Sequence, residues 1–387
     1  MFIRDFSQEK IASILVQLDR RASNHDDVFI KYLDFGTLIV RLICRSPQAA
    51  SSIEKQLAYV LCDDAPRHDF TLVVWQENSI AALAPELGLA SSNPLLERVR
   101  RLAKNTDYLV YDNSQSRLQP VLGLNLSSRS ASAYDHRTST YYFAAEDYSP
   151  EEFIKQGHAF VRLFNRILKG PQCALVHGAA VALEGEGILF CARGQRGKST
   201  LAVRAMLDGF DYVADDYLTL ERDGTGLYAW PIYSIITLGS IMYGDLYDTL
   251  QAKFVSNNAR KDKYVFNISA YHDRFVRRCP IHLCMFPQIV QDEEPSIVLC
   301  NQRGKGRAIV QLVHSTISQM GDKHDISTVK KLVNFLRNLP FYQINLCRDG
   351  EKNIHCLREF LLSGHCAQQE SLPGMLRSSA VQPTVFV

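Results

Sequence analysis

The strongest constraint on the fold is a short stretch in the middle of the chain. An apolar run at Gly187–Cys191 predicts a buried strand, and residues 200–207 have the apolar spacing of a helix. Between them lies a tight loop that ends in Gly197-Lys198-Ser199. A strand, a glycine-bearing loop, Lys-Ser and a helix, in that order, are the architecture of a phosphate loop. The stretch therefore predicts an α/β fold built around a nucleotide-binding loop.

The chemistry of such a loop follows largely from its backbone. The N–H groups of the loop and of the helix N-terminus point at one place and favour polyanions. Lys198 adds a positive charge for the outer phosphates, and the Ser199 hydroxyl suits Mg²⁺. The usual pattern has a glycine where this chain has Ala192, so the phosphate donor stays open between ATP and another nucleoside triphosphate. The residues predicted to bind the nucleotide are Gly194, Gln195, Arg196, Gly197, Lys198, Ser199 and Thr200.

Two carboxylates follow the predicted helix. Asp215 and Asp216 come directly after a short predicted strand at 212–214, and at this spacing we expect them to face the loop. One would hold Mg²⁺, and the other would accept the proton of an attacking hydroxyl. The spacing does not say which does which. His177 precedes another apolar strand, where a lone histidine is more often a structural residue.

The rest of the chain predicts two domains of mixed α/β structure. Residues 1–125 form an N-terminal α/β domain that is accessory or recruits a substrate, with a strand at Phe70–Trp75 and a hairpin turn around Asp34-Phe35-Gly36. Residues 126–367 form the domain that carries the loop. Ser-rich residues 124–140 are the predicted linker or long surface loop, and residues 368–387 are a predicted flexible tail.

Composition excludes several classes of partner. The 387 residues carry a net charge of +2, so no overall field favours nucleic acid or a membrane surface. The N-terminus lacks the apolar core of a signal peptide, and no apolar run approaches the roughly 20 residues of a membrane span. These features predict a cytoplasmic protein. Ten cysteines without a C-x-x-C pair predict reduced thiols rather than disulfides or a zinc site.

Taken together, these residues resemble the HPr kinase/phosphorylase family, whose catalytic domain shares its core with phosphoenolpyruvate carboxykinases. The order in that family is a His-Gly pair, an apolar strand, a loop ending Gly-Lys-Ser, and a segment ending Val-Ala-Asp-Asp. This chain shows the same order from His177-Gly178 to Asp215-Asp216, within a similar stretch of about 45 residues at 176–220. The resemblance implies an N-terminal α/β domain followed by an HPr kinase-like catalytic domain, and a phosphotransferase that uses ATP and Mg²⁺.

The resemblance also implies roles for single residues. Lys198 and Ser199 would bind the phosphates and Mg²⁺, Asp215 would be the base for the substrate hydroxyl, and Asp216 would lie near the metal. His177 becomes an active-site residue near the transferred phosphate.

Further basic residues should neutralise charge during transfer in such an enzyme. The best candidate is the basic segment 260–263, which ends in Lys263, with Arg274 and Arg277 behind it.

Departures from the family leave the acceptor open. The signature that accompanies removal of phosphate is not found, and the N-terminal part is unlike the usual regulatory domain, so a kinase that acts on another substrate than HPr is favoured. The leading hypothesis is transfer of the γ-phosphate to a Ser or Thr hydroxyl of a protein or peptide. One alternative is a kinase of a small hydroxylated metabolite. Another is a nucleotide-binding switch or scaffold whose degenerate loop binds without catalysis. Relatives often assemble, so a homo-oligomer stays open, although no heptad pattern argues for one.

Overall fold

The structure of the protein is a computed structural model. It describes residues 8–24, 29–80, 109–111, 122–125, 129–149, 158, 160–168, 170–194, 196–239, 246, 249–250, 254–258, 263–320 and 326–364. Within these residues the chain is a mixed α/β protein with two large mixed sheets, which confirms the predicted class. The predicted tail at 368–387 lies outside the described residues.

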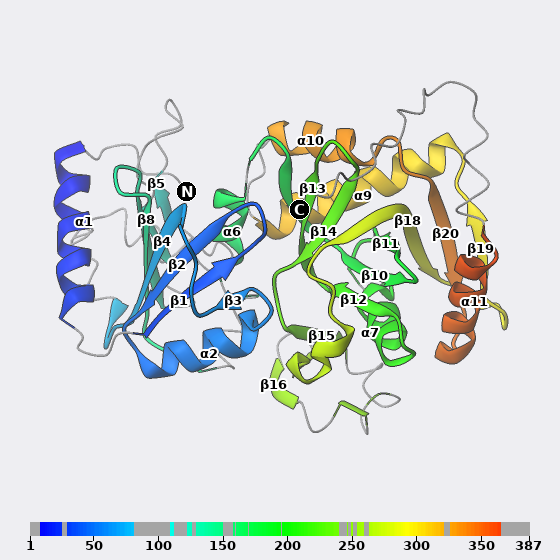
Figure 1. Ribbon diagram of the computed structural model, residues 1–387, viewed down its shortest axis with the longest axis horizontal. Coiled ribbons are helices and arrows are strands. Elements are labelled where there is room, and N and C mark those ends of the chain that lie inside the picture. Colours follow the sequence, from blue (N-terminus) through cyan, green and yellow to red (C-terminus); the bar gives the residue numbers. More distant parts are fainter. Residues whose placement is uncertain are drawn as a thin grey trace, which may run out of the picture.

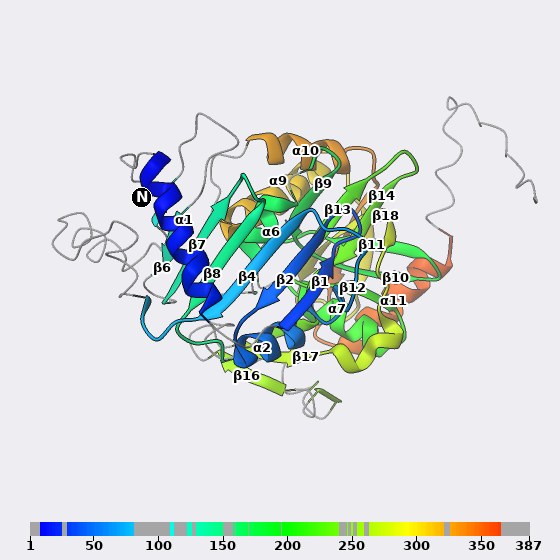
Figure 2. The ribbon, with the colours of Figure 1, turned by 60° about the vertical axis from the view of Figure 1, so that its left-hand side comes forward.

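The first sheet has eight strands in the order β3-β1-β2-β4-β8-β7-β6-β5. Its strands are β1 (Phe29–Asp34), β2 (Ile39–Cys44), β3 (Leu61–Cys62), β4 (Phe70–Gln76), β5 (Leu109–Tyr111), β6 (Leu122–Asn125), β7 (Ser130–Asp135) and β8 (Thr140–Ala145). The predicted hairpin turn joins β1 to β2, and the predicted strand at 70–75 is β4. Helix α1 (Gln8–Ser23) lies against one face of this sheet (Figures 1 and 2).

Helix α2 (Pro47–Leu57) packs into the core on the other face of the first sheet. Its start is set by two local signals. The Ser46 side chain accepts a hydrogen bond from the backbone N–H of Ala49, and Pro47 occupies the first turn, where its missing N–H costs nothing.

The predicted linker at 124–140 is wrong. These residues hold β7, which pairs antiparallel with both β6 and β8 inside the first sheet. The segment lacks large aliphatic residues because its core positions are filled by small ones: Ala131 and Ala133 are both buried. Small side chains bury little apolar area, so the strand gave no hydrophobic pattern. The first sheet therefore continues past the predicted domain boundary at residue 125 and ends at Ala145.

The second sheet has nine strands and carries the predicted loop. Its main path runs β12-β10-β11-β18-β14-β13-β9, and β20 pairs with both β18 and β19. The strands are β9 (Cys173–His177), β10 (Ala179–Leu183), β11 (Glu186–Phe190), β12 (Asp211–Ala214), β13 (Tyr217–Arg222), β14 (Leu227–Pro231), β18 (Cys279–Ile289), β19 (Ser296–Leu299) and β20 (Phe341–Leu346). The long strand β18 holds the sheet together, because its first residues pair with β14 and its later ones with β11 and β20.

Helices cover both faces of the second sheet. Helices α7 (Lys198–Leu207) and α11 (Gly350–Leu362) pack together on one side, and α9 (Gln302–Met320) and α10 (Ile326–Leu336) pack on the other (Figure 1). The remaining elements are α6 (Val161–Ile167), the 3₁₀ helix η2 (Ser269–Arg274), and a small antiparallel sheet of β15 (Ile235–Gly239), β16 (Phe254–Asn258) and β17 (Lys263–Asn267).

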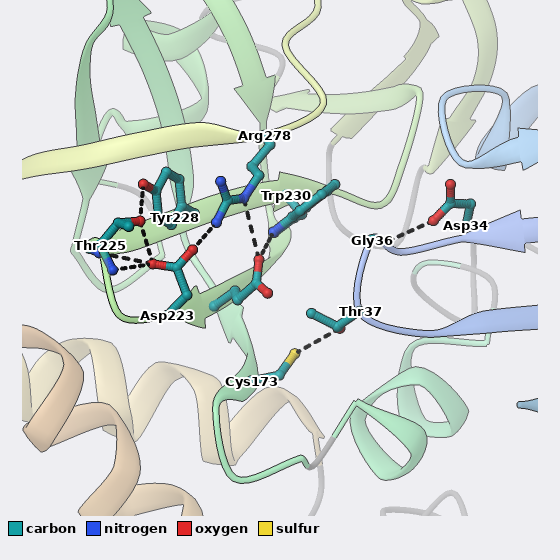
Figure 3. A network of polar contacts seen from close by, with 11 residues as sticks. Asp34, Gly36, Thr37, Cys173, Asp223, Thr225, Tyr228, Trp230 and Arg278 are labelled. Atoms are coloured by element: carbon teal, nitrogen blue, oxygen red, sulfur yellow. Dashed lines mark hydrogen bonds and ion pairs between the residues drawn. The ribbon is translucent and has the colours of Figure 1, made fainter. Parts of the chain in front are cut away.

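One of the three hydrophobic clusters among the described residues joins the two large sheets. Buried residues of β1, β2, β4 and α2 pack with residues of α6, β9 and β15 in a single cluster. At the edge of this core the β1–β2 turn reaches the second sheet, where the Thr37 hydroxyl lies 4.0 Å from the Cys173 sulfur (Figure 3). Gly36 in the same turn lies so close to the ring of Trp230 that an added Cβ would come within 2.4 Å of it. The first sheet is therefore fastened to the part of the chain that holds the loop.

Candidate active site

The predicted site residues meet at one edge of the second sheet because of how its strands run. Strand β10 is antiparallel to both β11 and β12, so β11 and β12 are parallel to each other. The register pairs Ala179 with Phe190 and Ala180 with Ala214, which puts the start of β10 beside the ends of β11 and β12. Strands lie about 4.8 Å apart, so the ends of β11 and β12 are separated by roughly 10 Å. The phosphate loop, His177-Gly178 and Asp215-Asp216 thus share the carboxyl edge where ligands bind in α/β sheets.

The predicted loop turns into helix α7 at a glycine. Gly197 lies at φ 88°, in the left-handed region that favours glycine, and helix α7 begins at the next residue. Lys198 is 5% exposed, and its ammonium donates to the carbonyl oxygens of Ala192 at 2.9 Å and Arg193 at 3.3 Å. Ala192 is fully buried, so its methyl group sits in the core where the usual motif has glycine.

The other predicted loop residues fall around this turn. Ser199 and Thr200 lie in the first turn of α7, and Arg196 is exposed. A Cβ on Gly194 would meet no atom within 4 Å, so the space beside the loop is open at that point. Gln195 and the side chain of Lys263 lie outside the described residues.

Two other predicted basic residues are engaged away from the loop. Arg277 forms an ion pair with Asp34 at 2.8 Å, and Arg274 donates to the carbonyl oxygen of Gly209 at 3.3 Å.

The acidic pair forms a sharp junction between β12 and β13. Asp216 has φ 63°, in the left-handed region that Asp tolerates better than most residues. The backbone N–H of Gly178 donates to the Asp216 carbonyl oxygen at 3.1 Å, which ties this junction to the one between β9 and β10. Asp215 is 2% exposed, whereas 14% of the Asp216 side chain is exposed. The sharp turn thus separates the two neighbouring carboxylates by their exposure to solvent.

The two carboxylates leave an electrostatic mark on a buried neighbour. Burial raises the pKa of Tyr212 well above its usual range, and the charges of Asp215 and Asp216 raise it further. Negative charge at the end of β12 opposes formation of the phenolate, and for the same reason it favours a cation nearby.

His177 is oriented by α9, and this brings it to Asp216. Its Nδ1 lies 2.5 Å from the Ser315 hydroxyl, and its backbone N–H donates to the Thr316 hydroxyl at 3.0 Å. Its Nε2 lies 3.4 Å from a carboxylate oxygen of Asp216. When the Ser315 hydroxyl donates to Nδ1, the Nε2–H faces the carboxylate. The structure therefore places His177 beside Asp216, at the shared edge of the sheet.

This set has the composition of a Ser-His-Asp triad, but not its layout. A nucleophilic serine has to reach its substrate, and Ser315 is 6% exposed inside α9. The ring nitrogens are also exchanged: here the serine lies at Nδ1 and the carboxylate at Nε2, whereas in the triad the serine meets Nε2 and the aspartate Nδ1. The arrangement suits an oriented carboxylate better than an activated serine.

Sequence reasoning missed His158. Its Nε2 lies 3.9 Å from the second carboxylate oxygen of Asp216, and the residue is 8% exposed. Nothing near position 158 forms a motif, and 58 residues of chain separate it from Asp216. Ser315 and Thr316 were missed for the same reason. Only spatial proximity to His177 and Asp216 identifies these residues.

The donors at this edge fit the predicted nucleotide and metal. Mg²⁺ prefers oxygen ligands and takes few of them from protein when phosphates supply others, which suits Ser199 and the two carboxylates. Among the described residues, no three His, Cys, Asp or Glu side chains form a group suited to a metal held by protein alone. The cysteines of the described segments are all free. No helix in the described part of the chain is long and apolar enough to cross a membrane.

The comparisons with known proteins show a distant resemblance of fold and nothing more specific. No protein-family model matches the chain, and no curated protein sequence matches it. The chain is similar to the solved structure of the Hpr(Ser) kinase/phosphatase from Coxiella burnetii, with 14% sequence identity over 51% of this chain and 99% of that chain, at a TM-score of 0.27. This is a distant resemblance of fold, and it carries no argument about activity.

Proposed function

We propose that this chain is an ATP-dependent kinase that transfers the γ-phosphate to a Ser or Thr hydroxyl of a protein or peptide. The observation that carries the proposal is the shared edge of the second sheet. The end of β11 with its phosphate loop, the His177-Gly178 junction and the Asp215-Asp216 junction lie there together. A phosphoryl transfer needs a phosphate cradle, a metal site and a base within one cleft, and these three junctions supply the residue types for each.

The proposed roles follow from the chemistry of each group. The loop N–H groups and Lys198 bind the outer phosphates, and Ser199 with Asp216 holds Mg²⁺, which neutralises phosphate charge when bound. Asp215 accepts the proton of the acceptor hydroxyl. At the same time the hydroxyl oxygen bonds to the γ-phosphorus, and the bond between that phosphorus and the ADP oxygen breaks. Asp215 is buried, which keeps bulk water away from its carboxylate and suits a base that takes its proton from a bound hydroxyl.

The roles of the two carboxylates can be separated by Asp215→Asn and Asp216→Asn. Turnover is measured as ADP formed from ATP in the presence of a Ser- and Thr-containing peptide library, and Mg²⁺-dependent nucleotide binding with a fluorescent ATP analogue. We expect Asp215→Asn to retain Mg²⁺-dependent binding and to lose turnover by at least about 100-fold. We expect Asp216→Asn to lose the Mg²⁺ dependence of binding. Normal turnover by Asp215→Asn would show that the base is assigned wrongly.

The proposal as a whole is tested with the unmodified chain and Lys198→Ala. Lys198→Ala should bind the nucleotide weakly, because the outer phosphates lose their nearest cation. Lys330→Ala, an exposed lysine on α10, is the matched control and should leave binding and turnover unchanged. Tight nucleotide binding without turnover for every peptide and for a panel of sugars and polyols would refute a kinase and favour a binding protein. Turnover with the polyols alone would favour the small-metabolite kinase.

A further inference from the structure

The Asp216 carboxylate is approached by two histidines, one at each oxygen. His177 Nε2 lies 3.4 Å from Oδ1, and His158 Nε2 lies 3.9 Å from Oδ2. The two residues come from different places, His177 from the end of β9 and His158 from the segment ahead of α6. At 3.9 Å the His158 contact is electrostatic rather than a hydrogen bond, and an N–H directed at a carboxylate is attractive at that range.

Packing holds the His158 ring in this place. Its ring centroid lies 4.9 Å from that of Tyr217 at an interplanar angle of 74°, and 4.5 Å from that of Tyr233 at 58°. Both tyrosines are buried, and they belong to separate elements, since Tyr217 begins β13 and Tyr233 precedes β15. Edge-on contacts of this kind restrict ring rotation. The His158 ring is thus held between Tyr217 of the second sheet and Tyr233, which lies just ahead of the small sheet of β15, β16 and β17.

The backbone of Asp216 does not by itself fix the carboxylate. The left-handed φ of 63° sets where the side chain leaves the chain, but rotation about its side-chain bonds still moves the oxygens. Two rings placed at the two oxygens restrict both bonds. Because 14% of the Asp216 side chain stays exposed, the carboxylate remains within reach of solvent and of a ligand.

We propose that His158 is a positioning residue that, with His177, holds the Asp216 carboxylate in the orientation needed for phosphoryl transfer. The proposal rests on the proposed function, since it assigns His158 a part in that reaction. Loss of the contact should lower kcat more than it weakens binding of ATP, because the Asp216 carboxylate is still present for Mg²⁺ and only its orientation is lost.

The test compares two substitutions that remove different properties of the ring. His158→Phe keeps an aromatic ring between Tyr217 and Tyr233 but has no nitrogen. His158→Gln loses the ring but can place an amide N–H near the former Nε2. We expect His158→Phe to lower kcat about 10- to 100-fold, the usual effect of losing a group that orients a ligand, with the KM for ATP within about twofold. His158→Gln should recover part of kcat. His314→Phe, an exposed histidine of α9, is the control and should keep the parent kcat.

Each outcome decides a separate point. An active parent chain whose His158→Phe variant keeps the parent kcat would overturn the role of His158 and leave the proposed kinase standing. Equal loss in the Phe and Gln variants, with lowered thermal midpoints, would mean that His158 serves packing alone and would also overturn the role. If His158→Phe does not fold, His158→Gln decides alone, and a fall in kcat at unchanged thermal midpoint supports the proposal. A parent chain without turnover would refute the kinase itself.

Discussion

Three glycines between β10 and α7 offer a way to separate backbone strain from side-chain contact. Gly194 does not have a left-handed φ, and a Cβ there would meet nothing within 4 Å. Gly185, in the turn between β10 and β11, has φ 86° and equally open surroundings. Gly197 has φ 88°, and its Cβ would also lie 2.7 Å from the Cδ1 of Leu346. Alanine should therefore add no strain at Gly194, backbone strain alone at Gly185, and backbone strain together with a steric contact at Gly197.

The expected free energies follow from these differences. A Gly→Ala change at a compatible position stabilises by about 0.4–1 kcal/mol, because the unfolded chain loses freedom. Gly194→Ala should thus be neutral or slightly stabilising. A left-handed conformation costs an L-residue roughly 1–2 kcal/mol, so Gly185→Ala should be destabilised by about 1 kcal/mol after the offset. Gly197→Ala must also displace the Leu346 methyl group in a packed region, which adds about 1–3 kcal/mol.

The assay is urea unfolding of the three variants and the parent, followed by tryptophan fluorescence. Free energies are compared at equal slope, so that a change in the denatured state is recognised. If Gly197→Ala is no less stable than Gly185→Ala, the inferred contact with Leu346 is wrong. If Gly185→Ala is as stable as Gly194→Ala, the inferred cost of a left-handed φ is wrong at Gly185 and at Gly197.

Three more predictions concern contacts within and between the sheets. Gly36→Ala should destabilise by about 2–4 kcal/mol in urea unfolding, because φ is 81° and its Cβ would collide with the Trp230 ring; parent-like stability would contradict this packing. Hydrogen bonds from Thr225 are the main cause that lowers the pKa of Asp223 to about 2. The ionised Asp223 therefore stabilises the folded protein fully above pH 3.8, and this contribution is lost as the pH falls through 2. Asp223→Asn should therefore be less stable than the parent at pH 6, and the difference in their free energies of unfolding should narrow at pH 3. A difference that does not depend on pH would contradict the lowered pKa of Asp223. Ser234→Ala should cost about 1–3 kcal/mol, since the buried hydroxyl bonds two backbone groups at the end of α2, whereas the exposed Ser51→Ala should be neutral.

Several elements could be predicted because their signals are local. The apolar run of β11, the Gly-Lys-Ser turn and the start of α7 lie within about 20 consecutive residues. The hairpin turn around Gly36 and the strand β4 are equally local, and both are present. In each case the residues that decide the backbone conformation are neighbours in the chain, so spacing alone suffices.

Two elements were missed because their local signals are weak. Strand β7 buries alanines, and these leave no strong apolar alternation. Helix α9 begins with two glycines, Gly304 and Gly306, which are poor helix formers. It is stabilised instead by apolar residues that pack on the second sheet, including Leu312 and Val313. Tertiary packing outweighs propensity in both cases.

The candidate site also has a part set by local sequence and a part set by tertiary packing. The sequence by itself located the predicted phosphate loop and the acidic pair, since each is a short motif of adjacent residues. Only the tertiary structure decided that His177 and His158 face the two oxygens of Asp216, and that Ser315 orients the first of them. Those contacts join residues 39 to 138 positions apart in the chain, with His177 and Asp216 the nearest pair and His177 and Ser315 the farthest. They exist because the register of β9 with β13 and of β10 with β12 brings distant junctions to one edge, and strand register is set by packing across the whole sheet.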